Sequence, residues 1–259
     1  RDTVPIAKDT DDDPLAGGTL QPMPLTVGPA SRATATDVPA VKEHPGRYKS
    51  IRTFAAGGMG KLFLVHDLHL NRDIILKELL PEHLEGVGTR PGTRTVDMLT
   101  VPVVARFMQE ARITSQLEHP AIVPVYELGY RDDGSLYYTM KYVRGRTLQD
   151  VLNETRTLSD RLNLLTRFLD LCQAIAYAHS RNVIHRDIKP LNVMVGEFGE
   201  TVVIDWGIAK VLGKEDIHAK DIAMASTALQ SGDTASLTKT VYGQAMGSPY
   251  FMAPEQAQG

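Results

Sequence analysis

The residues best suited to chemistry lie in the run His-Arg-Asp-Ile-Lys-Pro-Leu-Asn at residues 185–192. The carboxylate of Asp187 can accept and orient a substrate hydroxyl, and Lys189 can reach a phosphoryl group during its transfer. Asn192 offers a neutral oxygen to Mg²⁺, and Asp205 offers a second oxygen ligand at the end of an apolar run. These residue types favour phosphoryl transfer, which depends on positioning and charge neutralisation.

The joint pattern resembles the catalytic loop and the metal-binding loop of eukaryotic-type (Hanks-type) protein kinases. A lone Asp would be interpreted as a solvated charge, whereas the whole string is highly specific. The resemblance covers about residues 48–259. It implies an α+β bilobal kinase fold, a strand-rich N-lobe and an incomplete helical C-lobe. It also implies ATP and Mg²⁺ as cofactors and proteins that carry Ser or Thr as substrates, since Lys189 is typical of serine/threonine kinases. The motif Gly-Gly-Met-Gly is most similar to the bacterial branch of this kinase family.

The family's glycine-rich loop corresponds to residues 55–62. Glycines let backbone N–H groups approach phosphates closely. Here Ala55 replaces the family's first glycine and Leu62 replaces its usual valine. The residues that we assign to nucleotide binding in this loop are Ala55, Gly57, Gly58, Gly60 and Leu62.

Two charged residues resemble the pair that holds the α- and β-phosphates. Lys77 ends the run Ile-Ile-Leu-Lys, and Glu110 lies at the helical position that pairs with such a lysine. A strand-end charge and an exposed Glu are the simpler alternatives in isolation. Ile75 is bulkier than the family's usual alanine, which predicts a narrower nucleotide pocket.

The hinge between the lobes corresponds to residues 140–143. The resemblance implies that Met140 is the gatekeeper and that backbone groups of Lys141 and Val143 bond adenine. Lys141 stands where an acidic residue is common.

The activation segment, residues 205–255, is long for this family and ends in Ala-Pro-Glu. Arg186 precedes the catalytic Asp, and such an arginine can bind a phosphorylated residue through charge-assisted hydrogen bonds. Thr238 and Thr240 lie at a suitable distance before Glu255, so we expect autophosphorylation there. The alternative is that both are merely exposed loop residues.

The chain divides into a leader, an N-lobe and part of a C-lobe. Residues 1–46 lack Phe, Tyr and Trp, so we expect a disordered leader. Strands are expected over residues 48–55, 61–67, 72–78, 123–130 and 136–143, and a helix over 101–117, within an N-lobe of residues 47–143. In the partial C-lobe, residues 144–259, the clearest helix is 159–181, with Ser159 as N-cap and Cys172 in the core.

Composition excludes little. A net charge of −3 gives no reason to expect nucleic acid as a partner. The single cysteine fits a reducing compartment, so we expect the kinase domain to be cytoplasmic, and no apolar run is long enough to span a bilayer. The chain begins with Arg1 and resembles a piece of a longer protein, which we expect to be poorly stable and weakly active alone. Two other functions remain open, a nucleotide-binding pseudokinase scaffold and a small-molecule phosphotransferase.

Overall fold

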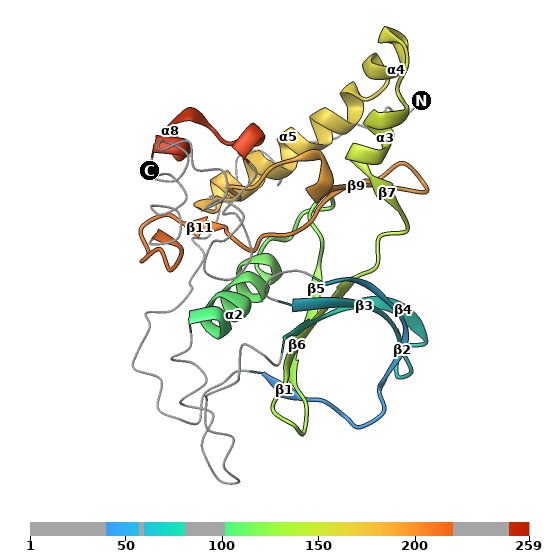
Figure 1. The fold of residues 1–259 in the computed structure, drawn as a ribbon, viewed down its shortest axis with the longest axis vertical. Coiled ribbons are helices and arrows are strands. Elements are labelled where there is room, and N and C mark those ends of the chain that lie inside the picture. Colours follow the sequence, from blue (N-terminus) through green and yellow to red (C-terminus); the bar gives the residue numbers. More distant parts are fainter. Residues whose placement is uncertain (1–39, 57–59, 81–101, 220–248, 259) are drawn as a thin grey trace, which may run out of the picture.

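The computed structural model describes residues 40–56, 60–80, 102–219 and 249–258 (Figure 1). Residues 1–39 of the expected leader therefore lie outside the described part. The end of the leader is ordered, contrary to the expectation for residues 1–46. There Val41–Lys42 form strand β1, which pairs in parallel with Gly129 and Tyr130. A short strand can be stabilised at the edge of an existing sheet even without aromatic residues of its own.

The N-lobe is a six-stranded sheet, made of the five strands that the sequence predicts and the unpredicted β1. Its order is β1-β5-β6-β4-β3-β2, and every neighbouring pair except β1 with β5 is antiparallel. The remaining strands are β2 (Tyr48–Ala56), β3 (Gly60–Asp67), β4 (Arg72–Leu79), β5 (Val125–Tyr130) and β6 (Leu136–Lys141).

Helix α2 (Pro102–Ser115) packs on this sheet, as expected for residues 101–117. Its side chains Phe107 and Met108 are buried in one cluster with Leu79 of β4 and Tyr138 of β6. This burial fixes the rotation of α2, so that Glu110 on the same helix faces β4 and β6.

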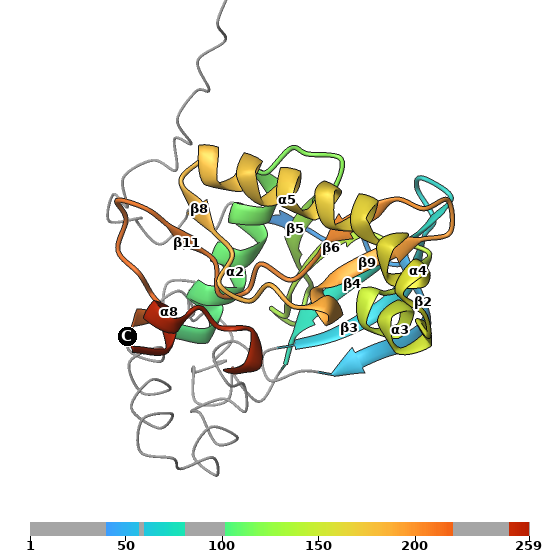
Figure 2. The same cartoon turned by 90° about the horizontal axis from the view of Figure 1, so that it is seen from above.

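The described part of the C-lobe is a set of helices above short strands. A strand trio has the order β10-β9-β7, and β11 pairs with β8. Figure 2 shows α5 running across this lobe, with α8 near one end and α3 and α4 near the other. The bounds are β7 (Gly145–Thr147), α3 (Leu148–Glu154), α4 (Leu158–Leu162), α5 (Leu165–Ser180), β8 (Val183–Ile184), η2 (Pro190–Asn192), β9 (Val193–Gly196), β10 (Thr201–Val203), β11 (Lys210–Val211), η3 (Pro249–Phe251) and α8 (Pro254–Gln258).

The expected helix over residues 159–181 is two helices, α4 and α5. Thr157, and not Ser159, is the N-cap of α4, because its hydroxyl accepts from the N–H of Asp160 while Asp160 accepts from the N–H of Thr157. The N–H of Leu164 then donates to Arg161 three residues back, at 3.0 Å, which tightens the turn and ends the first helix.

The apolar face of α5 is buried at only one end. Ala174 and Ala178 are buried, whereas Leu165, Phe168 and Leu169 are more than half exposed. The prediction that Cys172 lies in the core is wrong, because its side chain is exposed on the outer face. Among the described residues, none of the helices combines the length and the apolar character needed to cross a membrane.

The lobes share a core, which holds the site together. Ile113 and Leu117, at and beyond the end of α2, pack in one cluster with Val203 and Trp206 from the C-lobe. The N–H of Val123 also donates to the carbonyl of Val203 at 3.1 Å. The end of β10, and with it Asp205, is therefore attached directly to the N-lobe.

Candidate active site

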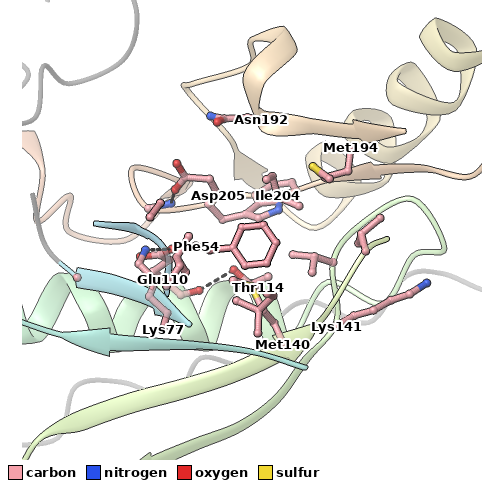
Figure 3. Close-up of a pocket in the computed structure, with 18 of the residues that line it drawn as sticks. Phe54, Lys77, Glu110, Thr114, Met140, Lys141, Asn192, Met194, Ile204 and Asp205 are labelled. Atoms are coloured by element: carbon pink, nitrogen blue, oxygen red, sulfur yellow. Dashed lines mark hydrogen bonds and ion pairs between the residues drawn. The ribbon is translucent and has the colours of Figure 1, made fainter. Parts of the chain in front are cut away.

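A cavity of about 890 Å³ lies between the N-lobe sheet and the catalytic loop. In Figure 3, Lys77, Glu110, Met140 and Lys141 come from the N-lobe side, and Asn192, Met194, Ile204 and Asp205 from the opposite side. Every described residue that the sequence assigned to the site lines this cavity: Ala55, Gly60, Leu62, Lys77, Glu110, Met140, Lys141, Val143, Asp187, Lys189, Asn192 and Asp205. Gly57 and Gly58 lie outside the described residues.

Lys77 and Glu110 form the pair that the sequence indicated. Lys77 Nζ donates to both carboxylate oxygens of Glu110, at 2.7 and 2.8 Å, and the Glu110 side chain is only 2% exposed. Burial disfavours the ammonium ion, but the charges of Glu110 and Asp205 outweigh this and raise the pKa of Lys77. Lys77 is therefore a fixed positive charge that faces the cavity.

The catalytic loop holds Asp187 through two donors. Its Oδ2 accepts from Lys189 Nζ at 2.7 Å and from Asn192 Nδ2 at 2.9 Å. Asn192 Nδ2 also donates to the backbone carbonyl of Asp187 at 2.9 Å. The three polar side chains of the sequence run are thus one hydrogen-bonded group, with the carboxylate oriented toward the cavity that they line.

His185 supports this loop through hydrogen bonds and ring packing. Its Nδ1 accepts from the N–H of Asp187 at 3.2 Å, its Nε2 faces the carbonyl of Ile204 at 3.4 Å, and its ring packs on Trp206. Burial lowers the pKa of His185, against the opposing charges of Asp205 and Asp187. A neutral ring with its proton on Nε2 satisfies both contacts.

The oxygen donors of the site fit Mg²⁺. The amide nitrogen of Asn192 is used by Asp187, which leaves the amide oxygen for a ligand, and Asp205 contributes a carboxylate to the same cavity. Asp205 has a φ of +61°, a left-handed conformation that non-glycine residues rarely adopt. The described residues contain no group of three or more His, Cys, Asp or Glu for a fully protein-coordinated metal. A two-ligand site suits Mg²⁺, which keeps waters and binds substrate phosphates.

The inner part of the cavity is apolar. Ile75 and Leu62 line it from the N-lobe, and Met194 and Ile204 line it from the C-lobe. The N–H of Lys141 is already used, since it donates to the carbonyl of Pro124 at 3.1 Å, and its side chain points away from the cavity (Figure 3). Gly60 is required by packing, because a Cβ there would lie 2.6 Å from the carbonyl oxygen of Glu78.

Several residues that line this cavity were not predicted from the sequence. Phe54 packs edge-on against Tyr142 at its mouth, with centroids 5.8 Å apart, and Arg52 lies over the Phe54 ring at 4.4 Å. Tyr138 lies deeper and contacts Glu110. The alternation of side chains along β6 could have indicated Tyr138, because it lies two residues before Met140 and therefore on the same face of the strand.

Arg186 has an acidic partner in the described part of the activation segment. Its Nη2 donates to Asp216 Oδ2 at 2.6 Å, and Lys210 Nζ lies 3.9 Å from the same oxygen. Gln256 of α8 donates to the backbone carbonyl of Arg186 at 2.9 Å. Arg186 therefore contacts both the early activation segment and helix α8 near its end. The expected phosphorylation sites Thr238 and Thr240 lie outside the described residues.

A strand-rich lobe with a Lys–Glu pair, facing a loop that carries Asp, Lys and Asn, defines a protein kinase domain. Residues 48–259 match the protein kinase domain family, and the chain belongs to it. It is 34% identical to the serine/threonine-protein kinase PknD of Protochlamydia amoebophila over 223 residues, 82% of this chain and 21% of the relative.

Two chlamydial relatives show a similar match. PknD of Chlamydia trachomatis serovar D is 34% identical over 223 residues, and PknD of Chlamydia pneumoniae is 33% identical over 224, each covering 82% of this chain and 22% of the relative. These matches confirm the resemblance to bacterial Hanks-type kinases. The chain spans about a fifth of the length of the curated relatives that it matches.

Proposed function

We propose that this domain transfers the γ-phosphoryl group of ATP to Ser or Thr hydroxyls of proteins. The observation that supports this most is that Lys77, Asp187, Asn192 and Asp205 line one cavity of about 890 Å³. This volume lies within the range of small-molecule and cofactor sites. The relatives' printed name, serine/threonine-protein kinase, supports the same substrate class.

Each polar residue has a role that its contacts support. Asp187 orients the substrate hydroxyl and accepts its proton as the oxygen attacks the γ-phosphorus and the bond to the ADP oxygen breaks. Lys189, 2.7 Å from Asp187, neutralises charge on the group in transfer. Lys77 binds the nucleotide phosphates while Glu110 keeps it in place. Bound Mg²⁺ neutralises phosphate charge, and Asn192 and Asp205 would hold it.

The nucleotide base would lie in the apolar part of the cavity, between Ile75 and Met194. We further propose that Met140 is the gatekeeper, that backbone groups of Lys141 and Val143 bond adenine, and that the domain works in the cytoplasm, where ATP is present. Autophosphorylation at Thr238 or Thr240 would create a second anion for the Arg186 region, which already binds Asp216.

The test is incubation of the protein with MgATP, with mass-spectrometric mapping of phosphate, against Asp187→Asn. We expect incorporation to fall at least about a hundredfold in the variant, because general-base catalysis contributes that much or more. Phosphate on Thr238 or Thr240 in the wild type alone would support both the activity and the sites.

The pseudokinase alternative makes a different prediction. It requires nucleotide binding with no phosphate transfer in the wild type, and its sequence support is Ala55 and Ile75. The presence of the whole set of Lys, Glu, Asp, Asn and Asp in one cavity opposes it. Wild-type protein that binds ATP but incorporates no phosphate would overturn the proposed activity.

A further inference from the structure

Tyr138 makes a contact that the Lys–Glu pair does not explain. Its side chain is buried, and its Oη donates to Glu110 Oε1 at 2.7 Å. That oxygen also accepts from Lys77 Nζ, so two donors from the sheet converge on one oxygen of α2. A buried carboxylate needs such donors, because an ion taken out of water is costly unless it is hydrogen-bonded.

The sheet register makes this convergence possible. Lys77 of β4 and Tyr138 of β6 are directly paired across neighbouring antiparallel strands, and cross-strand partners of this kind lie side by side on one face. Lys77 Nζ lies 5.7 Å from the centroid of the Tyr138 ring, and the ring of Phe107 on α2 packs against the same ring with centroids 5.2 Å apart. The phenol is thus fixed by both the sheet and the helix.

ATP binding affects the two donors to Glu110 differently. Lys77 must share its ammonium with phosphate oxygens once ATP is bound, whereas the hydroxyl of Tyr138 keeps Glu110 as its acceptor. Burial and the charge of Glu110 hold the pKa of Tyr138 well above its usual value, so the phenol remains a donor at physiological pH.

We propose that Tyr138 is a positioning residue of the nucleotide site, whose hydroxyl holds Glu110 beside Lys77 and so docks α2 before nucleotide binds. The inference rests on the proposed function, since it assigns Lys77 to the phosphates. It predicts that Tyr138→Phe lowers the fraction of molecules with α2 docked. The apparent dissociation constant for ATP rises in inverse proportion to that fraction, and saturating ATP restores the docked state.

The experiment measures binding of MgATP and of adenosine to the wild-type chain and to Tyr138→Phe by isothermal titration calorimetry. We expect ATP to bind about tenfold more weakly to the variant, the factor for one lost hydrogen bond to a charged group. Adenosine has no phosphates for Lys77 to contact, so we expect its affinity to be unchanged. In a phosphotransfer assay, the KM for ATP rises in the same ratio while kcat is retained.

Tyr137→Phe is the matched control. Tyr137 is the adjacent residue of β6, fully buried, and its hydroxyl donates to Glu127 at 2.8 Å, away from the cavity. The control is expected to bind both ligands like the wild type. Unchanged ATP affinity in Tyr138→Phe, or equal loss of ATP and adenosine, would overturn the inference alone. A wild-type chain that binds neither ligand would overturn the proposed function and this inference with it.

Discussion

Ile74 and Ile75 are consecutive residues of β4 that face opposite sides of the sheet. Ile75 lines the cavity, whereas Ile74 is buried with Val65 and Tyr137. The resemblance places alanine at the position of Ile75 in the family, so we expect Ile75 to narrow the nucleotide pocket. We therefore expect Ile75→Ala to improve binding of an ATP analogue with a bulkier base by about tenfold, because the shorter side chain opens the part of the cavity where the base is proposed to lie. Calorimetry with the analogue and with ATP measures the preference.

Ile74→Ala is the control for this substitution, because it removes the same atoms from the other face. It is expected to lower the free energy of unfolding by about 2–5 kcal/mol, the usual cost of a buried Ile-to-Ala change. It should leave the preference between the two nucleotides unaltered. An equal shift of preference in both variants would mean that Ile75 does not act through its position in the cavity.

At the scale of the element, the end of β3 carries a histidine with two acceptors. His66 Nδ1 lies 2.8 Å from Asp73 Oδ1, and its Nε2 lies 3.1 Å from Asn71 Oδ1. The hydrogen bonds to Asp73 and then to Asn71 raise the pKa of His66 above its usual 6.5. The ion pair is therefore fully present below about pH 6.5, and it is lost as the pH rises through the raised pKa.

Proton NMR of the His66 ring measures this directly. We expect a titration midpoint above 6.5 in the wild type and a lower one in Asp73→Asn. Asp132→Asn, which removes an exposed carboxylate paired with Lys42, is expected to leave the midpoint of His66 unchanged. A wild-type midpoint at or below 6.5 would contradict the assigned contacts.

The bridge between Arg186 and Asp216 joins the catalytic loop to the early activation segment. Both side chains are largely buried, at 13% and 11% exposure. Burial raises the pKa of Asp216, but the hydrogen bonds and the charge of Arg186 outweigh this and leave the pKa below its usual value. A double-mutant cycle of Arg186→Gln and Asp216→Asn, read by urea unfolding, is expected to give a coupling of about 1–3 kcal/mol. The exposed pair Lys42–Asp132, at 59% and 69% exposure, should give less than about 1 kcal/mol. Equal coupling energies in the two pairs would show that burial does not strengthen the ion pair between Arg186 and Asp216.

The elements that the sequence predicted well are those with a strong local signal. Period-2 alternation located β2 to β6 within a residue or two, and apolar spacing located α2. The break between α4 and α5 was missed, because it depends on the local hydrogen bond from the N–H of Leu164 to the carbonyl of Arg161. The cap at Thr157 was missed, because Ser159 is a plausible alternative. Strand β1 was missed because its stability comes from its partner β5 and not from its own residues.

The same division applies to the site. Residues of the catalytic loop could be assigned because their chemistry and spacing are specific, and the structure brings them to one cavity with Lys77 and Glu110. Tyr138 and Phe54 do not belong to a specific sequence motif of this kind. Their positions in the cavity follow from strand register and ring packing, which are properties of the folded chain.

At the scale of the whole molecule, the described residues bury their apolar side chains in four clusters and leave much of the apolar face of α5 exposed. Phe107 of α2 is fully buried, whereas Phe168 of α5 is 61% exposed. An apolar residue contributes to stability in proportion to the area that it removes from water. In the 259-residue chain, we therefore expect Phe107→Ala to lower the free energy of unfolding by about 3–5 kcal/mol and Phe168→Ala by less than about 1 kcal/mol. Urea unfolding of both variants against the wild type measures the difference. A loss of several kcal/mol in Phe168→Ala would mean that other residues of the chain cover the outer face of α5. The two phenylalanines would then contribute equally to the free energy of unfolding.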